Sequence, residues 1–191
     1  MIEWPDIDFG FLKKINPDTI GWIYLDDTSI SYPVVKGRDD GYYLRHNFSC
    51  EESPHGCIYA EFEDEFPGKR VYFVGHNMKD NSMFAYITYY YYDKGFVDRN
   101  PVINLKTPDA DYDIRIWGTM HFPKECIYML QPLKDERIFR EWKAAIEKMC
   151  PFRPKYDLKF DDDIAIFGTC RPFKEVSDGV LIAVGRIEKV H

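Results

Sequence analysis

Cys170 and His76 are the two residues whose types and surroundings best fit nucleophilic catalysis. Cys170 closes an apolar run, residues 164–170, which has the composition of a buried strand that ends in a small-residue turn. His76 follows a second apolar run, residues 71–74, and a glycine. An imidazole beside a thiol favours the thiolate–imidazolium pair, and the thiolate is the nucleophile. Two strand ends that each deliver one member of a Cys–His pair would therefore form a site for covalent catalysis.

Other pairings stay open, because the chain has five cysteines and five histidines. His121 also ends an expected strand and is the best rival base. The alternative interpretation of Cys170 is a small buried hydrophobic residue, which is a common environment for free cysteine. The alternative for His76 is a surface histidine, or one whose hydrogen bonds are satisfied within the fold.

The sequence gives no reason to expect a metal or another cofactor. Residues 46–57 contain two histidines and two cysteines, but their spacing fits none of the usual zinc patterns. The acidic triplet 161–163 is interpreted as a solvated turn. An odd, sparse set of cysteines is also not a disulfide framework.

Length and composition favour one folded domain over residues 1–191. The chain is 45% hydrophobic and 17% aromatic, which argues against disorder. The net charge is −7, and the sequence has no basic stripe that could neutralise phosphates, so nucleic acid is not an expected partner. No run of about 18 apolar residues and no signal peptide are present, so we expect no membrane-spanning segment in this chain.

The elements that must position the pair are mainly strands. Eight segments have strand character: 21–25, 30–35, 57–59, 71–74, 103–105, 112–120, 164–167 and 180–187. Alternation in 112–120 places the even-numbered residues from Tyr112 to Gly118 on one face. Helices are predicted at about 6–15, after a Ser82 cap and at about 134–149. Because strands and helices do not alternate regularly, a closed or nearly closed β-barrel with peripheral helices fits best.

Five segments match the patterns of one known family in order along the chain. They are 16–23 (NPDTIGWI) for N-x-D-T-V-G-W-I, 28–35 (TSISYPVV) for T-x-I-D-Y-P-V-V, 39–44 (DDGYYL) for D-N-x-x-Y-L, 75–84 (GHNMKDNSMF) for G-H-N-M-K-x-G-S-M-F, and 167–170 (FGTC) for L-S-T-C. By these segments the chain resembles the class B sortases, the cysteine transpeptidases of Gram-positive cell surfaces. The resemblance implies an eight-stranded sortase-type β-barrel.

The resemblance also implies a two-step acyl transfer. Cys170 would attack the Thr–x bond in the C-terminal sorting motif of a surface protein. An amine of peptidoglycan or of another surface protein, such as a pilin, would then resolve the thioacyl intermediate. His76 would protonate the leaving amine and deprotonate the incoming one. The protein would work at the extracellular face of the cell membrane, held by an N-terminal anchor that lies outside this chain.

The substrate groove implied by the family would be walled partly by Leu44, with Asp40 nearby. Gly168 and Thr169 would form its floor. These four residues are the expected substrate-binding positions, and their roles rest on the resemblance.

One position departs from the family, which has an arginine ten residues after the cysteine; here that residue is Val180. Arg171 is the more plausible stand-in, because Arg186 lies six residues further along the strand, about 20 Å at the usual rise. A transition-state charge contact is worth about 10²–10³ in rate. A catalytically weak or inactive sortase-fold peptide-binding protein is therefore the alternative function. A generic Cys–His hydrolase and a structural β-barrel also stay open.

Overall fold

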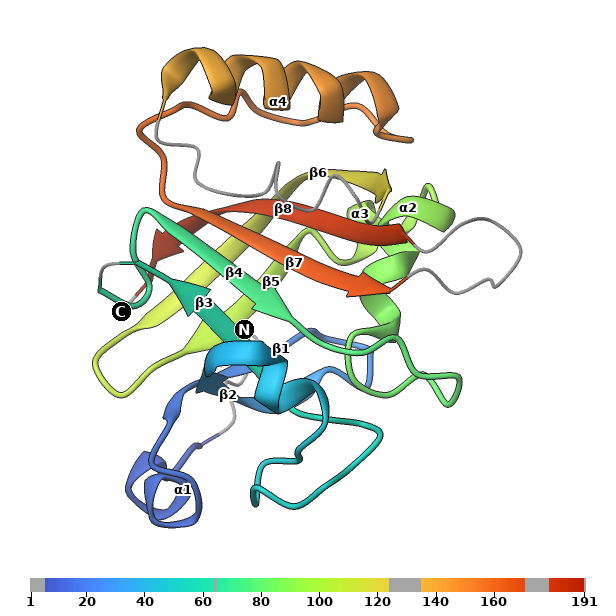
Figure 1. Cartoon of the computed structure of the whole chain (residues 1–191). Helices are drawn as coiled ribbons and strands as arrows, with labels where there is room; N and C mark the ends of the chain where they lie inside the picture. Colours follow the sequence, from blue (N-terminus) through green and yellow to red (C-terminus); the bar gives the residue numbers. More distant parts are fainter. Residues whose placement is uncertain (1–5, 64, 124–134, 171–178, 191) are drawn as a thin grey trace.

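The computed structural model describes residues 6–63, 65–123, 135–170 and 179–190 (Figure 1). The side chains at positions 39, 40, 122, 123 and 170 are outside this description. The strands are β1 (Thr19–Tyr24), β2 (Ser31–Lys36), β3 (Ile58–Phe62), β4 (Arg70–Val74), β5 (Val102–Lys106), β6 (Asp111–Pro123), β7 (Ile164–Cys170) and β8 (Gly179–Lys189). They close into a barrel in the order β1-β2-β3-β4-β7-β8-β6-β5. The predicted mainly-β fold, an eight-stranded closed barrel, is confirmed.

Short helices surround this barrel. They are α1 (Phe9–Ile15), η1 (Asp39–Leu44), η2 (Ala85–Thr88), α2 (Tyr89–Tyr92), α3 (Phe96–Arg99) and α4 (Glu136–Met149). In Figure 1, α4 lies across β6 and β8, while α2 and α3 lie beside one end of the barrel. None of the helices in the described residues combines the length and the apolar character that crossing a membrane requires.

Strand alternation divides the apolar side chains into two groups. Inward residues such as Phe73, Phe167 and Leu181 form the barrel interior. Outward residues of β7 and β8, such as Ile166 and Ile182, pack with Trp142 of α4 in a second cluster. The sheet is therefore buried on both faces here, which explains why β7 is a continuous apolar run rather than an alternating one.

A bulge in β6 changes which face its later residues occupy. The register of β6 with β8 shifts between Ile116 and Gly118. Ile116 packs in the barrel interior, yet a Cβ at Gly118 would lie 2.9 Å from Ile146 of α4. The expected alternation from Tyr112 to Gly118 is therefore wrong at Gly118, because the bulge adds one residue to the strand. Residues after the bulge, including His121, take the face opposite to the one that simple alternation gives.

Two neighbouring strands, β4 and β7, run parallel (Figure 1). Parallel strands end at the same edge of a sheet. β4 is followed by Gly75 and His76, and β7 ends at Cys170. The barrel topology therefore brings the two expected catalytic positions to one edge.

Candidate active site

The register between β4 and β7 aligns His76 with Cys170. Paired residues keep one constant sequence offset, from Arg70 with Ile164 to Val74 with Gly168, and the same offset relates His76 to Cys170. The amide of Gly75 donates to the carbonyl of Gly168 at 3.2 Å, so the ladder continues beyond the last paired residues. The backbone positions of His76 and Cys170 are therefore neighbours at the end of the sheet.

The imidazole of His76 is held by the backbone of η1. Its Nε2 lies 2.7 Å from the carbonyl oxygen of Leu44. Because a carbonyl only accepts, Nε2 carries the hydrogen and donates it. In the neutral ring Nδ1 is then the nitrogen without a proton. This hydrogen bond selects the tautomer that carries the hydrogen on Nε2.

Position 75, directly before His76, has no room for a side chain. A Cβ at Gly75 would lie 2.4 Å from Ile58 and 2.9 Å from Phe84, both of which are buried core residues. Such contacts force neighbours to move. Glycine at position 75 therefore sets His76 directly against the end of the barrel.

The loop after His76 folds back on the histidine. The amide of Phe84 donates to the carbonyl of His76 at 2.8 Å, and the amide of Met83 donates to the Tyr32 hydroxyl at 3.1 Å. Met83 has a φ of 55°, in the left-handed region, so it cannot belong to a helix. The prediction that a helix begins at a Ser82 cap is therefore wrong. The first helical residue is Ala85, and the Ser82 hydroxyl donates to Asp80 instead.

A buried polar network supports η1, which presents the Leu44 carbonyl. The Tyr43 hydroxyl donates to Asp18 at 2.6 Å, and the fully buried Asn16 donates to the Tyr43 oxygen at 3.0 Å. Burial, and then the hydrogen bond to Asp18, raise the pKa of Tyr43. Burial alone would raise the pKa of Asp18, but hydrogen bonds from Tyr43 and Arg38 hold it below the ordinary value. The 16–18 segment thus anchors the turn that orients His76.

Two other cysteines with described side chains, Cys57 and Cys150, have poorer settings for a nucleophile. Burial raises the pKa of the Cys57 thiol to about 12, so almost no thiolate forms at neutral pH. Burial also raises the pKa of Cys150. Cys126 lies outside the described residues. These settings favour Cys170, whose side chain is outside the description, over Cys57 and Cys150 as the nucleophile.

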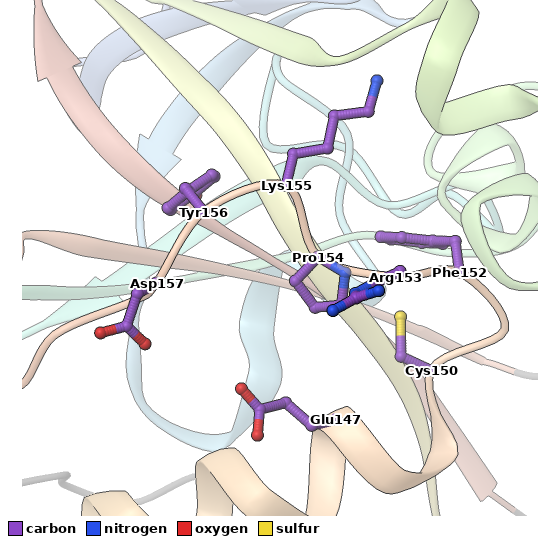
Figure 2. A pocket seen from close by; sticks show the side chains of 8 residues that line it. All are labelled: Glu147, Cys150, Phe152, Arg153, Pro154, Lys155, Tyr156 and Asp157. Atoms are coloured by element: carbon purple, nitrogen blue, oxygen red, sulfur yellow. The ribbon is translucent and has the colours of Figure 1, made fainter.

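Figure 2 shows Cys150 in a hollow beside the end of α4, among Glu147 and residues 152–157. The eight lining residues labelled there include no histidine. Lys155 of this hollow forms an ion pair with Asp98 at 2.6 Å. The hollow therefore offers no Cys–His chemistry.

His121, the rival base, lies in the barrel interior. It pairs in register with Leu181, an interior residue, and it stacks edge-on against Tyr91 at 4.1 Å between ring centroids. Its Nε2 lies 3.1 Å from the Tyr92 hydroxyl. Ile166 and Gly168 of β7 lie on the outward face. His121 therefore faces the other side of the sheet.

The expected substrate-binding positions lie around the two strand ends. Leu44 is half-buried at the end of η1, where its carbonyl contacts His76. Asp40 lies in the same turn, and its side chain is outside the description. Thr169 pairs with the interior residue Leu181 and is 3% exposed, so its side chain lies on the inward face with Phe167. Gly168 is on the outward face, where a Cβ would lie 2.1 Å from the Tyr72 hydroxyl. Tyr72 was not among the residues predicted from the sequence, although its even spacing from His76 places both on one face.

The residue that faces Cys170 across the sheet is apolar. Val180 of β8 pairs directly with Cys170 of β7. Arg186 pairs with Ile164 at the other end of β7, where it bonds Glu188 and stacks on Tyr156. Arg186 therefore cannot reach the site. Arg171 lies outside the described residues.

Among the residues described, no group of three or more His, Cys, Asp or Glu side chains is arranged to hold a metal ion.

The barrel resembles known sortase structures. No protein-family model matches the chain. Sortase B of Listeria monocytogenes is 28% identical over 178 residues, which cover 92% of this chain and 72% of that protein. The sortase B structure from Clostridium perfringens superimposes with a TM-score of 0.84 at 25% identity, covering 95% of this chain and 100% of that one. A Staphylococcus aureus sortase B–substrate complex gives a TM-score of 0.84 at 23% identity, over 96% of this chain and 85% of that one.

These likenesses define a sortase-type barrel. The chain is related in sequence to sortase B proteins, and sortase B structures share its fold. Both findings support the interpretation that this chain is a class B sortase. Sortases are a family of transpeptidases.

Proposed function

We propose that this protein is a cysteine transpeptidase that cleaves the Thr–x bond in the C-terminal sorting motif of surface proteins. It transfers the acyl group from Cys170 to an amine of peptidoglycan or of another surface protein. One observation carries the proposal: the parallel ladder of β4 and β7 aligns the positions of His76 and Cys170 at one edge of a sortase-type barrel. The single catalytic domain spans residues 1–191.

In the first step the Cys170 thiolate attacks the threonine carbonyl carbon. A C–S bond forms, the C–N bond of the Thr–x peptide breaks, and the leaving nitrogen takes a proton from Nδ1 of imidazolium His76. The products are a thioester on Cys170 and a free amine. The Leu44 carbonyl keeps the ring oriented throughout, because Nε2 donates to it in both protonation states.

In the second step an acceptor amine attacks the thioester carbonyl. Neutral His76 takes the amine proton on Nδ1, a C–N bond forms, and the C–S bond breaks to restore the Cys170 thiolate. The thiolate–imidazolium pair is thereby regenerated. No oxidant, metal ion or nucleotide enters the balance of either step.

The substrate peptide runs in a groove beside η1 and the end of β7. Leu44 and Asp40 border it, and Gly168 and Thr169 lie beneath it. Arg171, next in the chain to Cys170, supplies the positive charge that Val180 does not. The S. aureus structure described as a substrate complex supports a peptide partner, since it has the same barrel.

We place this reaction at the extracellular face of the cell membrane. The partners are then surface proteins that carry sorting motifs, and cell-wall or pilin amines. The basis is the likeness to sortases.

A second function is favoured by one observation. Because Val180 rather than a cation faces Cys170, the chain has the features of a sortase-fold protein that binds sorting peptides and turns them over weakly or not at all. This alternative shares the fold and the groove with the first. It differs only in the rate of thioester formation.

The experiment that tests the proposal follows products from a panel of sorting-motif peptides, with and without an amine acceptor, by liquid chromatography and mass spectrometry. A product that joins the peptide's threonine to the acceptor amine supports a transpeptidase. Hydrolysed peptide alone would indicate a hydrolase. Peptide binding without either product would contradict the proposal and favour the binding protein.

A further inference from the structure

Tyr72 lies directly over Gly168 on the outward face of the sheet. A Cβ at Gly168 would be 2.1 Å from the Tyr72 hydroxyl oxygen and 2.7 Å from its Cζ. Real Cβ atoms do not tolerate such contacts, so any larger residue at position 168 would displace the phenol. The hydroxyl therefore occupies the space that a side chain at position 168 would otherwise fill.

The phenol points toward the candidate active site. In register Tyr72 is opposite Ile166, but its hydroxyl lies over Gly168, one outward position further along β7. The side chain thus leans along the strands toward their carboxyl ends. Cys170 is the next outward position after Gly168, about 7 Å beyond it at the usual strand rise. The hydroxyl is therefore directed along the row that ends at Cys170.

The strand on the other side of β7 is apolar at the same level. Ile182 pairs with Gly168, and Val180 pairs with Cys170. Both pack in the apolar cluster beneath α4. Among the described side chains that face outward on β4, β7 and β8 near position 170, the polar ones are Tyr72 and His76.

We propose that Tyr72 is a further substrate-binding residue: its hydroxyl donates a hydrogen bond to a backbone carbonyl of the sorting peptide where the peptide crosses Gly168. The inference rests on the proposed function, since it uses the same groove. A phenol keeps its proton at neutral pH and can donate one hydrogen bond while it accepts others. An extended peptide presents carbonyls along its length, and a fixed donor selects one register of the peptide over Cys170.

The test compares Tyr72→Phe, which keeps the ring and removes only the hydroxyl, with Tyr156→Phe as a matched control. Tyr156 also packs against the outward cluster, but its hydroxyl donates to the Arg115 carbonyl at 2.6 Å. Arg115 pairs with Arg186, so this contact lies far along β8 from Val180. We expect Tyr72→Phe to raise KM for the peptide roughly tenfold with kcat little changed, as loss of a uniform binding contact predicts. Tyr156→Phe should lower the thermal midpoint and leave KM within about twofold of wild type.

A binding measurement separates this inference from the proposed function. The dissociation constant of the peptide is compared for Cys170→Ala and for Cys170→Ala with Tyr72→Phe, so that no turnover is needed. A roughly tenfold weaker complex for the double variant supports Tyr72 even where the wild type forms no product. Equal dissociation constants, or a KM shift that Tyr156→Phe reproduces, would overturn the role of Tyr72. Failure of the peptide to bind Cys170→Ala would overturn both proposals.

Discussion

The Nε2 atom of His76 donates a hydrogen bond to the carbonyl oxygen of Leu44 at 2.7 Å. This contact joins two segments that lie far apart in the sequence: the turn η1 and the residues after β4. In the proposed mechanism the two ring nitrogens have separate tasks: Nε2 orients the ring, and Nδ1 exchanges protons with the substrate. The proposed mechanism depends on this division.

Replacing His76 by glutamine separates orientation from proton transfer. The amide of Gln can still donate to the Leu44 carbonyl, but it cannot exchange a proton near neutral pH. We expect His76→Gln to slow peptide turnover by roughly 10²–10⁴-fold. The thermal midpoint should change little. The measurement is kcat beside a thermal melt, and wild-type kcat in this variant would exclude His76 as the acid–base group.

The Tyr43 hydroxyl is expected to stabilise η1 and, through it, the position of Leu44. Tyr43→Phe leaves Asn16 and Asp18 with fewer partners in a buried site, which costs about 1–3 kcal/mol. Urea denaturation measures this loss. Tyr24→Phe is the control, since the Tyr24 hydroxyl bonds Asp26 at the exposed surface, and it should change stability by less than about 0.5 kcal/mol. Equal effects of the two substitutions would argue against the network.

Stability should depend on Asp18 in the acid range. The folded-state pKa of Asp18 is below its ordinary value of 3.8, through hydrogen bonds that outweigh the opposing effect of burial. The ionised carboxylate therefore contributes stability above pH 3.8, and this contribution is lost as the pH falls through the lower folded-state pKa. Urea midpoints of wild type and Asp18→Asn should differ most above pH 3.8 and converge as the pH falls through the lowered folded-state pKa of Asp18. A difference that stays constant with pH would contradict this assignment.

Val180 is expected to limit the rate of thioester formation, because even with Arg171 as a stand-in the strand position that pairs with Cys170 carries no cation. Val180→Arg places a cation opposite Cys170, where it can stabilise developing negative charge on the substrate carbonyl. We expect acylation to become roughly tenfold faster or more, measured by rapid quench and intact mass. Val180→Met is the control for side-chain length without charge. If the arginine and methionine variants acylate at the same rate, position 180 does not limit the reaction.

The sequence was sufficient to predict the strands and the barrel. All eight predicted segments overlap strands of the structure, because alternating or continuous apolar runs bounded by Gly, Pro and Asp identify strands well. The segment 39–44, which matches one family pattern, forms the helical turn η1. The predictions fail where the local backbone conformation departs from the regular one. The left-handed conformation of Met83 delays the start of the helix to Ala85, and the bulge after Ile116 moves Gly118 to the outward face.

The contacts that build the site were beyond sequence reasoning, because they depend on strand order. Only the parallel neighbours β4 and β7 reveal that His76 and Cys170 share one register offset. The Leu44 carbonyl at His76 and the Tyr72 phenol over Gly168 are contacts between segments 32 and 96 residues apart. No local sequence pattern encodes such contacts. The sequence therefore predicts His76 and Cys170 at two strand ends, but it does not predict the Leu44 and Tyr72 contacts around them.

The most direct test of the account locates the acyl group on the protein. Wild-type protein is incubated with a sorting-motif peptide, quenched in acid and digested, and each cysteine-containing fragment is weighed. We predict a thioacyl mass on the fragment that contains Cys170, which disappears in Cys170→Ala and persists in Cys50→Ala. An adduct on another cysteine, or one that survives in Cys170→Ala, would contradict the account. So would the absence of any adduct in both the wild type and Val180→Arg.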